Sequence, residues 1–518
     1  MRWWKRFAKK FVVDYLYCFA CCGFASIAGG LTAFYAILRW FPVAEMLRSL
    51  ALDSLLFVLL LLLPARFRKA LLWLVFPFIF VTGLFAAVHV ALYQSTLSIF
   101  AVQAVLETSL NEAAEFVADH FATSHVLVLL ILLSAIGVLI FRVALRALPR
   151  LGRRSQLFYF ALAVISVVGW HIHRDGSKFL ESNATYVVVK AIFRYPIDAA
   201  IAREQRSLRN TLHIQEVRLL DKPASARRTY VFIIGESVNR NRMSLYGYHR
   251  PTSPRLKSLL EQGEILPFTD VISSHTHTVG SLHAALLFHT LNSTLSLEPS
   301  LLTLMNQAGF ATWWISNQTA NSSRGSSIAL ISGDAKYQIW LNRARHEGRS
   351  VIYDDVLLPA LDKALRDPAP NKAIFLHMIG AHLTYALRYP PEENFFTKSD
   401  DIPDRAWRGK NGKHYINTYD NAIHFTDKVV DAVIRMVQQE EGHSLVVFFS
   451  DHGQEVYDLR PIRGQDSRNP TRNMIDIPFI LWFSRAYVEA NPALVTQARL
   501  GVCRSVNRPK KVLHEGRI

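Results

Sequence analysis

Residues 446–454, VVFFSDHGQ, form an apolar run that ends in a carboxylate and an imidazole, Asp451 and His452. Open α/β sheets build their sites at the carboxyl ends of strands, so this pair lies where a site is expected. Carboxylate and imidazole groups are ligands of zinc and similar metals. Because an adjacent Asp and His at a strand end is costly to bury unless bound or hydrogen-bonded, the pair favours a metal site.

A second apolar run, TYVFIIGES, ends in Glu236, and Thr278 opens a later apolar stretch. We expect a helix to begin near Val279, with Thr278 at or beside its N-cap. A threonine hydroxyl is a weak nucleophile unless activated, and a metal is one activator. A helix N-terminus also favours a phosphate. The simpler interpretation of Thr278 is a helix cap, and Thr276 is the alternative nucleophile.

His382 follows the apolar run IFLHM, in which His377 is expected to be a core residue. The position of His382 after a central strand suits a proton donor, a phosphate ligand or a second metal ligand, and the alternative is a polar loop residue. Weaker candidates for holding phosphate oxygens with amide or guanidinium groups are Asn317, Gln318, Arg324 and Arg472.

The second half of the chain alternates strand and helix patterns. Apolar runs predict strands at 229–235, 311–316, 372–379, 444–450 and 477–483. Amphipathic patterns between them predict helices at about 252–262, 299–308, 353–366 and 415–438. This alternation predicts an α/β sandwich with a mainly parallel sheet.

The first half of the chain predicts an α-helical membrane domain. Five apolar segments approach the length that crosses a bilayer: 13–39, 49–64, 70–93, 123–146 and 156–173. The N-terminus and two of the links are rich in Lys and Arg, whereas residues 94–122 contain neither. The basic segments are therefore expected to be cytoplasmic, which places everything after residue 174 on the far side, the periplasm of a bacterium. A cleavable signal peptide is not expected.

The outer loop has apolar positions at helical spacing, which predicts an amphipathic helix near 98–120 lying at the membrane interface. Thr108 and Glu112 are four residues apart, so they share a face of this helix. The simpler interpretation of that face is a polar surface in contact with solvent. We expect residues 1–175 to form the five-helix domain and 176–225 a bridging helix. Residues 226–518 then form the periplasmic catalytic domain, shortened at its C-terminus.

The composition of the chain restricts the classes of binding partner that are expected. The chain of 518 residues is too long for one ordinary domain, and its net charge is +17. No helix-turn-helix, zinc-finger or RNA-binding signature accompanies that charge, so a nucleic-acid partner is not expected, whereas a positive surface suits anionic lipid. Three of the four cysteines fall within the first apolar segment, so the catalytic domain is expected to lack an internal disulfide.

Several motifs resemble those of the phosphoethanolamine transferases of Gram-negative inner membranes, which have an alkaline-phosphatase/sulfatase-like domain. They are LETSLNEAAEF, GESVNRNRMSLYGYHRPTSP, WISNQ, GAHLTYALRYP, YDNAIHFTD, SDHGQEVYD and NPTRNMIDIPF. EVYD, NPTR and the lack of a catalytic-domain disulfide, since Cys503 is the one cysteine after residue 22, are most similar to the branch that modifies heptose of the lipopolysaccharide core.

The resemblance implies one zinc ion held by Glu236, Thr278, Asp451 and His452. Thr278 would attack phosphatidylethanolamine, carry phosphoethanolamine as a covalent intermediate, and pass it to an acceptor hydroxyl of lipopolysaccharide. Thr108 and Glu112 match positions that hold the donor head group, and His382 matches a substrate or second-metal histidine. We expect a membrane-bound monomer, and the basic N-terminal segment places its N-terminus in the cytoplasm.

The chain departs from the family at Asn473, where NPTRH is usual, and after ILWFS, where its C-terminal sequence differs. The first departure weakens the case for a second metal or for one proton donor. Alternatives are glycerol-phosphate transfer, as in lipoteichoic acid synthases, another phospho-group transferase or hydrolase of the superfamily, or an inactive membrane scaffold. A sulfatase is disfavoured because no Cys-x-Pro-x-Arg motif occurs.

Overall fold

A computed structural model describes residues 63–108, 110–121, 183–211, 226–288, 299–319, 331–342 and 352–507, with scattered residues between 52 and 181. The chain divides into two compact units. One comprises Met1–Leu106 and Val117–Tyr195, and the other Glu107–Phe116 and Pro196–Ile518. Helix α10, Ala184–Thr211, spans the division and lies within the predicted bridge at 176–225. The predicted domain boundaries stay a prediction.

The first unit contains helix α4, Ala65–Tyr93, which corresponds to the predicted span at 70–93. Within it, Trp73–Tyr93 is the only helix among the described residues that is long and apolar enough to cross a membrane. Its Trp73 and Leu74 side chains are 61% and 71% exposed, as expected for a helix that meets lipid rather than water. The other four predicted spans lie almost entirely outside the described residues, so the number five stays a prediction.

The amphipathic segment is two helices, not the single helix predicted at 98–120. Helix α5 covers Ile99–Glu107 and helix α6 covers Leu110–Phe121. Thr108 lies between the two helices. Short hydroxyl side chains compete for backbone hydrogen bonds within a helix, so they favour the ends of helices. The helical periodicity continues through the break, which is why the break escaped the prediction.

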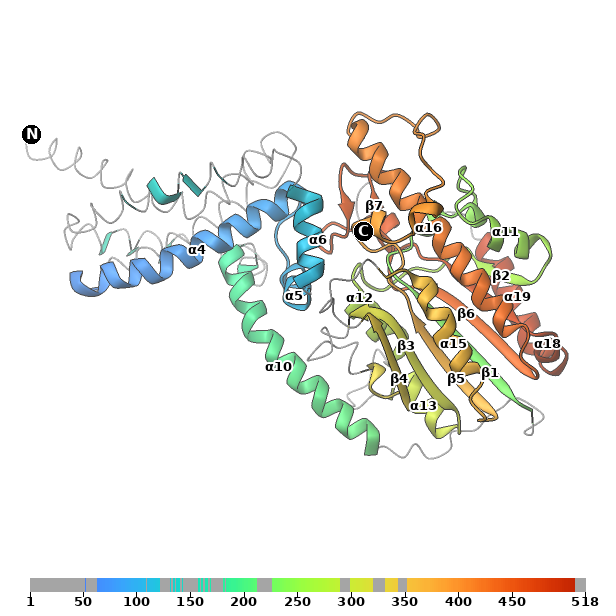
Figure 1. Ribbon diagram of the computed structural model, residues 1–518. Coiled ribbons are helices and arrows are strands. Elements are labelled where there is room, and N and C mark those ends of the chain that lie inside the picture. Colours follow the sequence, from blue (N-terminus) through green and yellow to red (C-terminus); the bar gives the residue numbers. More distant parts are fainter. Residues whose placement is uncertain are drawn as a thin grey trace, which may run out of the picture. The chain divides into compact units, whose positions relative to one another are not determined.

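The second unit is built on a seven-stranded sheet with the order β2-β9-β6-β1-β5-β3-β4 (Figure 1). The strands are β1 Arg228–Gly235, β2 Ile265–Phe268, β3 Ala311–Thr319, β4 Tyr337–Asn342, β5 Asn371–His377, β6 His443–Ser450 and β9 Phe479–Phe483. Only β9 runs antiparallel to its neighbours. The mainly parallel α/β sheet is therefore confirmed. Both strands missing from the prediction, β2 and β4, lie at the two edges of the sheet.

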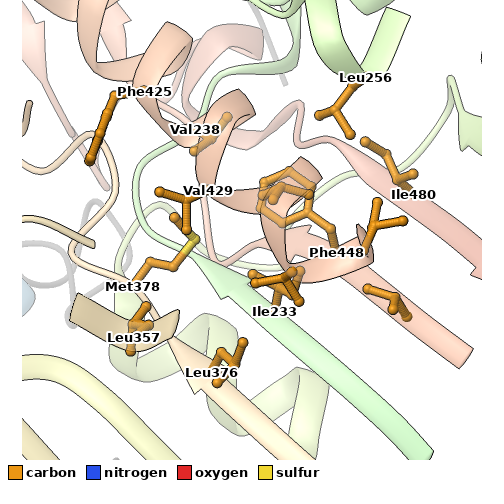
Figure 2. Close-up of a cluster of buried hydrophobic side chains, with 14 of the residues drawn as sticks. Ile233, Val238, Leu256, Leu357, Leu376, Met378, Phe425, Val429, Phe448 and Ile480 are labelled. Carbon is orange, nitrogen blue, oxygen red and sulfur yellow. The ribbon is translucent and has the colours of Figure 1, made fainter. Parts of the chain in front are cut away.

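Apolar side chains pack on both faces of the sheet. Along β1, Val231 and Ile233 point into one buried cluster, and Tyr230 and Ile234 into the other, because successive strand residues face opposite sides. The first cluster includes side chains of α11 Pro254–Glu261, α15 Leu357–Leu365 and α16 Gly409–Val437 (Figure 2). The second includes side chains of α12 Thr278–Leu286, α13 Leu301–Gln307, α18 Arg485–Ala490 and α19 Pro492–Asn507.

The register of the two central strands determines where their ends meet. Strands β1 and β6 are parallel neighbours, and Gly235 pairs with Ser450 at their last residues. The pairing continues one step further, because the backbone N–H of Asp451 donates to the Gly235 carbonyl at 3.0 Å. The residues that follow each strand, Glu236 and Asp451, are therefore brought to one place by backbone hydrogen bonds.

Replacing Leu376 with alanine tests the first core. This side chain is fully buried in β5, so we expect Leu376→Ala to lower the free energy of unfolding by about 2–5 kcal/mol through lost burial and a cavity. Leu494, which is 53% exposed, is the control, with an expected change within about 0.5 kcal/mol on replacement by alanine. Urea unfolding of the detergent-solubilised protein measures both. Equal losses would contradict the assigned core.

Candidate metal centre

Three buried side chains converge at the carboxyl ends of β1 and β6. One ligand atom from each of Glu236, Asp451 and His452 lies within 4.8 Å of the others. His452 Nε2 is 3.4 Å from Glu236 Oε1 and 3.3 Å from Asp451 Oδ2. The side chains are at most 1% exposed. The structure thus brings together the three residues that the two apolar runs pointed to.

Thr278 joins this triad as the first residue of helix α12. Its hydroxyl donates to Glu236 Oε2 at 3.1 Å and lies 3.4 Å from His452 Nε2. The helix N-terminus contributes positive partial charge at the same place. Among the described residues, Thr278 rather than its rival Thr276 contacts the triad, and the Thr276 side chain is buried instead. This geometry favours Thr278 as the reacting hydroxyl.

Burial shifts the pKa of each triad residue in the direction that favours its neutral form, and a bound cation would reverse the shifts of the two carboxyl groups. Burial, with a smaller contribution from Asp451, raises the pKa of Glu236 to about 7. Burial also raises the pKa of Asp451 and lowers the pKa of His452. Each shift disfavours the charged form of a group, and two carboxylates compete for the same small volume. A bound cation restores both carboxylates to their ionised forms.

The donor atoms fit such a cation. Asp451 Oδ2 is buried and has no hydrogen-bond partner among the described residues. His452 Nδ1 lies 2.8 Å from the Gly453 carbonyl, an acceptor that fixes the proton on Nδ1 and leaves a lone pair on Nε2 beside the carboxylates. Three oxygen donors and one imidazole nitrogen, from Glu236, Thr278, Asp451 and His452, are a set that zinc accepts.

Surrounding groups hold the ligands in place. The backbone N–H groups of Ser237 and His452 both donate to Asp451 Oδ1, at 3.0 and 2.7 Å. The Ser237 hydroxyl donates to Glu236 Oε1 at 2.7 Å. Ser237 adopts a φ of +62°, a conformation that a non-glycine residue rarely adopts and that the surrounding contacts must stabilise. Sequence reasoning singled out none of these supporting contacts.

Two further predicted residues lie beside Glu236. Gln318, near the end of β3, donates to the Met378 carbonyl at 2.9 Å, and its Nε2 is 3.4 Å from Glu236 Oε2. His382 follows β5, is half-buried, and is close enough for a protonated ring to lower the pKa of Glu236. Its Nδ1 is buried without a hydrogen-bond partner among the described residues.

The remaining predicted residues are not brought to the triad by any described contact. Asn317 is fully buried and donates to Asp354 Oδ1 at 2.9 Å. Arg472 pairs with Asp476 at 2.8 Å and is 45% exposed. Arg324 lies outside the described residues. Thr108 is exposed between α5 and α6, and Glu112 lies in α6, where its side chain is not described.

Gln465 is a site residue that sequence reasoning missed. Its side-chain nitrogen lies 3.0 Å from His452 Nε2, the same nitrogen that faces Glu236 and Asp451. A short hairpin positions it, because β7 Glu455–Val456 pairs with β8 Arg463–Gly464 immediately before Gln465. Two-residue strands carry no periodicity, so the sequence offered no signal for this residue.

The position of Asn473 explains how the chain accommodates its departure from the family motif. Asn473 is buried at the start of the short helix α17, Arg472–Ile475. It accepts a hydrogen bond from Asn241 at 3.1 Å and lies 3.5 Å from Asp458. No contact with the triad is described, so the asparagine here is part of a polar network beneath the site.

Buried ion pairs secure the loop that follows Glu236. Arg242 and Arg250 both pair with Asp420, which is fully buried in α16, at 3.2 and 2.7 Å. Arg242 also pairs with Asp458 at 2.6 Å, and Arg250 with Asp401 at 2.7 Å. Each guanidinium therefore has an anionic partner inside the fold. The motif NRNRMSLYGYHR thus has a structural explanation that does not require contact with substrate.

Comparison with known proteins agrees with this site. Residues 228–501 match the sulfatase family. The chain is 31% identical over 460 residues to phosphoethanolamine transferase EptC of Escherichia coli (strain K12), an alignment that covers 85% of this chain and 79% of EptC. It is 30% identical over 467 residues to phosphoethanolamine transferase CptA of Salmonella typhimurium (strain LT2), covering 86% of this chain and 79% of CptA.

A solved structure is similar over nearly the whole length. The integral membrane protein lipooligosaccharide phosphoethanolamine transferase A (EptA) from Neisseria meningitidis covers 93% of this chain, and this chain covers 92% of EptA. The TM-score is 0.66 at 21% identity, so the likeness shows a shared fold. With the sequence relatives and the convergent site, these matches show that the chain belongs to the sulfatase family and, within it, to the phosphoethanolamine transferases.

Proposed function

We propose that this enzyme is a zinc-dependent transferase that moves phosphoethanolamine from phosphatidylethanolamine to lipopolysaccharide, through a covalent intermediate on Thr278. The observation that carries the proposal is the convergence of the Thr278 hydroxyl with Glu236, Asp451 and His452 in one buried cluster. We place the enzyme in the bacterial inner membrane as a monomer, with its N-terminus in the cytoplasm and its catalytic domain in the periplasm.

Glu236, Thr278, Asp451 and His452 would hold one zinc ion. When bound, that ion lowers the pKa of the Thr278 hydroxyl and neutralises charge on the phosphoryl group. The protein contributes the orientation of the hydroxyl: Thr278 begins a helix whose N-terminus favours an incoming phosphate. The Asn473 substitution leaves a second metal without one of its usual ligands, so one ion is the proposed number.

In the first half of the reaction, Thr278 Oγ1, already deprotonated, attacks phosphorus and the bond from phosphorus to the glycerol oxygen breaks. Protonated His382 donates its proton to that oxygen, and diacylglycerol leaves. In the second half, neutral His382 takes a proton from an acceptor hydroxyl, the acceptor oxygen attacks phosphorus, and Thr278 Oγ1 is released in the deprotonated form in which it began. The two-step route predicts ping-pong kinetics.

Residues around the triad are proposed to hold the donor. Gln318 lies beside Glu236 and can donate to a phosphoryl oxygen. Arg324 and Arg472 are proposed to bind phosphoryl oxygens because both carry positive charge. Thr108 and Glu112 are proposed to bind the ethanolamine head group. Asn317 is better explained as a support for Asp354, since its side chain is fully buried against that carboxylate.

We propose a heptose hydroxyl of the lipopolysaccharide core as the acceptor. The support is the pair of motifs EVYD and NPTR, which resemble the core-modifying branch. In the structure one hydrogen bond joins them: Thr471 of NPTR donates to Glu455 of EVYD at 2.8 Å. Glu455 also accepts the backbone N–H groups of Asp458 and Leu459 at 2.7 and 2.8 Å. The two motifs therefore act as one structural unit near the site.

Replacing the nucleophile tests the reaction. We expect Thr278→Ala to abolish transfer, because no covalent intermediate can form, while Thr276→Ala keeps most of the activity. Mass spectrometry of lipopolysaccharide from cells expressing each variant, fragmented to separate core from lipid A, measures the product. Full transfer by Thr278→Ala would contradict the mechanism. Addition to lipid A by the unaltered protein would contradict the proposed acceptor while keeping the chemistry.

Zinc binding should depend on pH. Because the metal-free pKa of Glu236 is raised to about 7, a cation must displace a proton below that pH. We expect zinc affinity to rise about tenfold per pH unit for one displaced proton and to level off above about pH 7. Calorimetry in two buffers of different ionisation enthalpy measures affinity and proton release together. Affinity that is independent of pH below 7 would contradict the assignment.

The raised pKa of Glu236 also determines how the stability of the metal-free protein changes with pH. A carboxyl whose folded pKa is raised stabilises the fold fully below its ordinary pKa, here 4.5, and loses that contribution as pH rises through about 7. The Glu236→Gln variant, which cannot ionise, is the control. We expect it to bind zinc weakly and to show a flatter dependence of metal-free unfolding on pH.

A further inference from the structure

The loop after β5 carries His382 and crosses the backbone of Glu236. The Ala381 N–H donates to the Glu236 carbonyl at 2.9 Å. Gly380 packs so closely that an added Cβ would lie 2.5 Å from the same carbonyl oxygen, and its φ is +49°. Only glycine suits both constraints at this position. The placement of His382 beside the metal ligands therefore depends on how this short loop is held.

Asp354 holds the loop from one side. This residue opens the short helix η5, Asp354–Val356, and its side chain is 1% exposed. Its Oδ1 accepts the Ile379 N–H at 2.9 Å, and its Oδ2 accepts the Gly380 N–H at 2.8 Å. Both carboxylate oxygens are thus used on consecutive backbone groups, which fixes the direction in which the chain leaves β5.

Asn317 supports Asp354 from the neighbouring strand. Its side-chain nitrogen donates to Asp354 Oδ1 at 2.9 Å, and the Asn317 side chain is fully buried. Asp354 therefore receives three hydrogen bonds in a site closed to water, two from the loop backbone and one from β3. Hydrogen bonds of this number and burial are typical of a group that orients others.

Arg388 holds the same loop from its far end. Its guanidinium donates to the Leu383 carbonyl at 2.7 Å and to the His382 carbonyl at 3.2 Å, and the residue is 6% exposed. It also pairs at 2.7 Å with Glu115, which belongs to the same structural unit. The Asp354 carboxylate thus accepts hydrogen bonds from the amide groups at the start of the loop, and the Arg388 guanidinium donates hydrogen bonds to the carbonyl groups at its end.

We infer that Asp354 is a positioning residue of the transferase, which acts through the loop 379–382 to hold His382 at the reacting centre, with Asn317 supporting it. This inference rests on the proposed role of His382 as proton donor and acceptor. It assigns to Asp354 no contact with the substrate. Its function is to keep the imidazole within reach of the leaving oxygen, where a displacement of about 1 Å costs about 100-fold in rate.

The test is a double-mutant cycle in the full-length, zinc-loaded enzyme. We expect Asp354→Asn to lower kcat by about 10- to 100-fold, with KM for phosphatidylethanolamine changed by less than about threefold. The adjacent, exposed Asp355→Asn is the matched control and should keep the original kcat. In a His382→Ala background, Asp354→Asn should have no further effect, because the residue through which it acts is gone.

Two outcomes overturn the inference. One is an equal loss from Asp354→Asn in the presence and absence of His382, and the other is zinc affinity weakened in parallel with kcat, which would place the effect on the metal ligands. Asn317→Ala, a milder change expected to cost about tenfold in kcat, replaces Asp354→Asn in the same cycle if that variant fails to fold.

The proposed function is separately tested by Thr278→Ala. An active His382→Ala enzyme would overturn the positioning role of Asp354, whereas loss of transfer in Thr278→Ala would still support the covalent mechanism. The failure of one proposal can therefore be distinguished from the failure of the other.

Discussion

The structure depends on one electrostatic constraint: two carboxylates and an imidazole are held within 4.8 Å of one another and closed off from water. Without a cation, burial disfavours the charged form of all three groups. Such a cluster is unfavourable in isolation, so the fold must hold it by stronger means than the mutual attraction of its members. Backbone pairing between β1 and β6 provides this, since it extends past Ser450 to Asp451 itself.

Three of the four carboxylate oxygens of the triad have hydrogen-bond partners. Asp451 Oδ1 accepts two backbone N–H groups and Glu236 accepts the hydroxyls of Ser237 and Thr278, which leaves Asp451 Oδ2 without a partner among the described residues. One unpaired acceptor in an otherwise satisfied cluster marks the direction from which a ligand completes it. Beneath this layer, the buried pairs of Arg242 and Arg250 with Asp420 keep the loop after β1 rigid.

Sequence reasoning identified the parts of the site that follow long apolar runs. Glu236 and Asp451 each follow a buried strand, and Thr278 opens a helix, so periodicity and the strand-end rule were sufficient. The central strands were found for the same reason. The edge strands were missed because β2 has only four residues, with Pro267 among them, and β4 is partly exposed, so neither has the continuous apolar run of a central strand.

The residues that the sequence did not reveal reach the site through tertiary contacts. Gln465 follows a two-residue strand, and Asp354 lies in a short helix with an acidic neighbour, Asp355, that looks equivalent in sequence. Burial separates the two aspartates, and burial is a property of the fold. Asn317 was predicted for its amide group, whose nitrogen donates to Asp354 inside the protein. The presence of an amide side chain in the sequence cannot by itself distinguish binding of a phosphate from support of a buried carboxylate.

The separation of the ligands along the chain has a consequence for biosynthesis. The backbone of Ser237 binds the side chain of Asp451 across 214 residues, so the two halves of the site are made far apart in time. Contacts of such long range form late in folding. A chain whose synthesis has not yet reached β6 carries Glu236 and Thr278 without Asp451 and His452. The cluster that fits a cation therefore cannot form until β6 has joined the sheet.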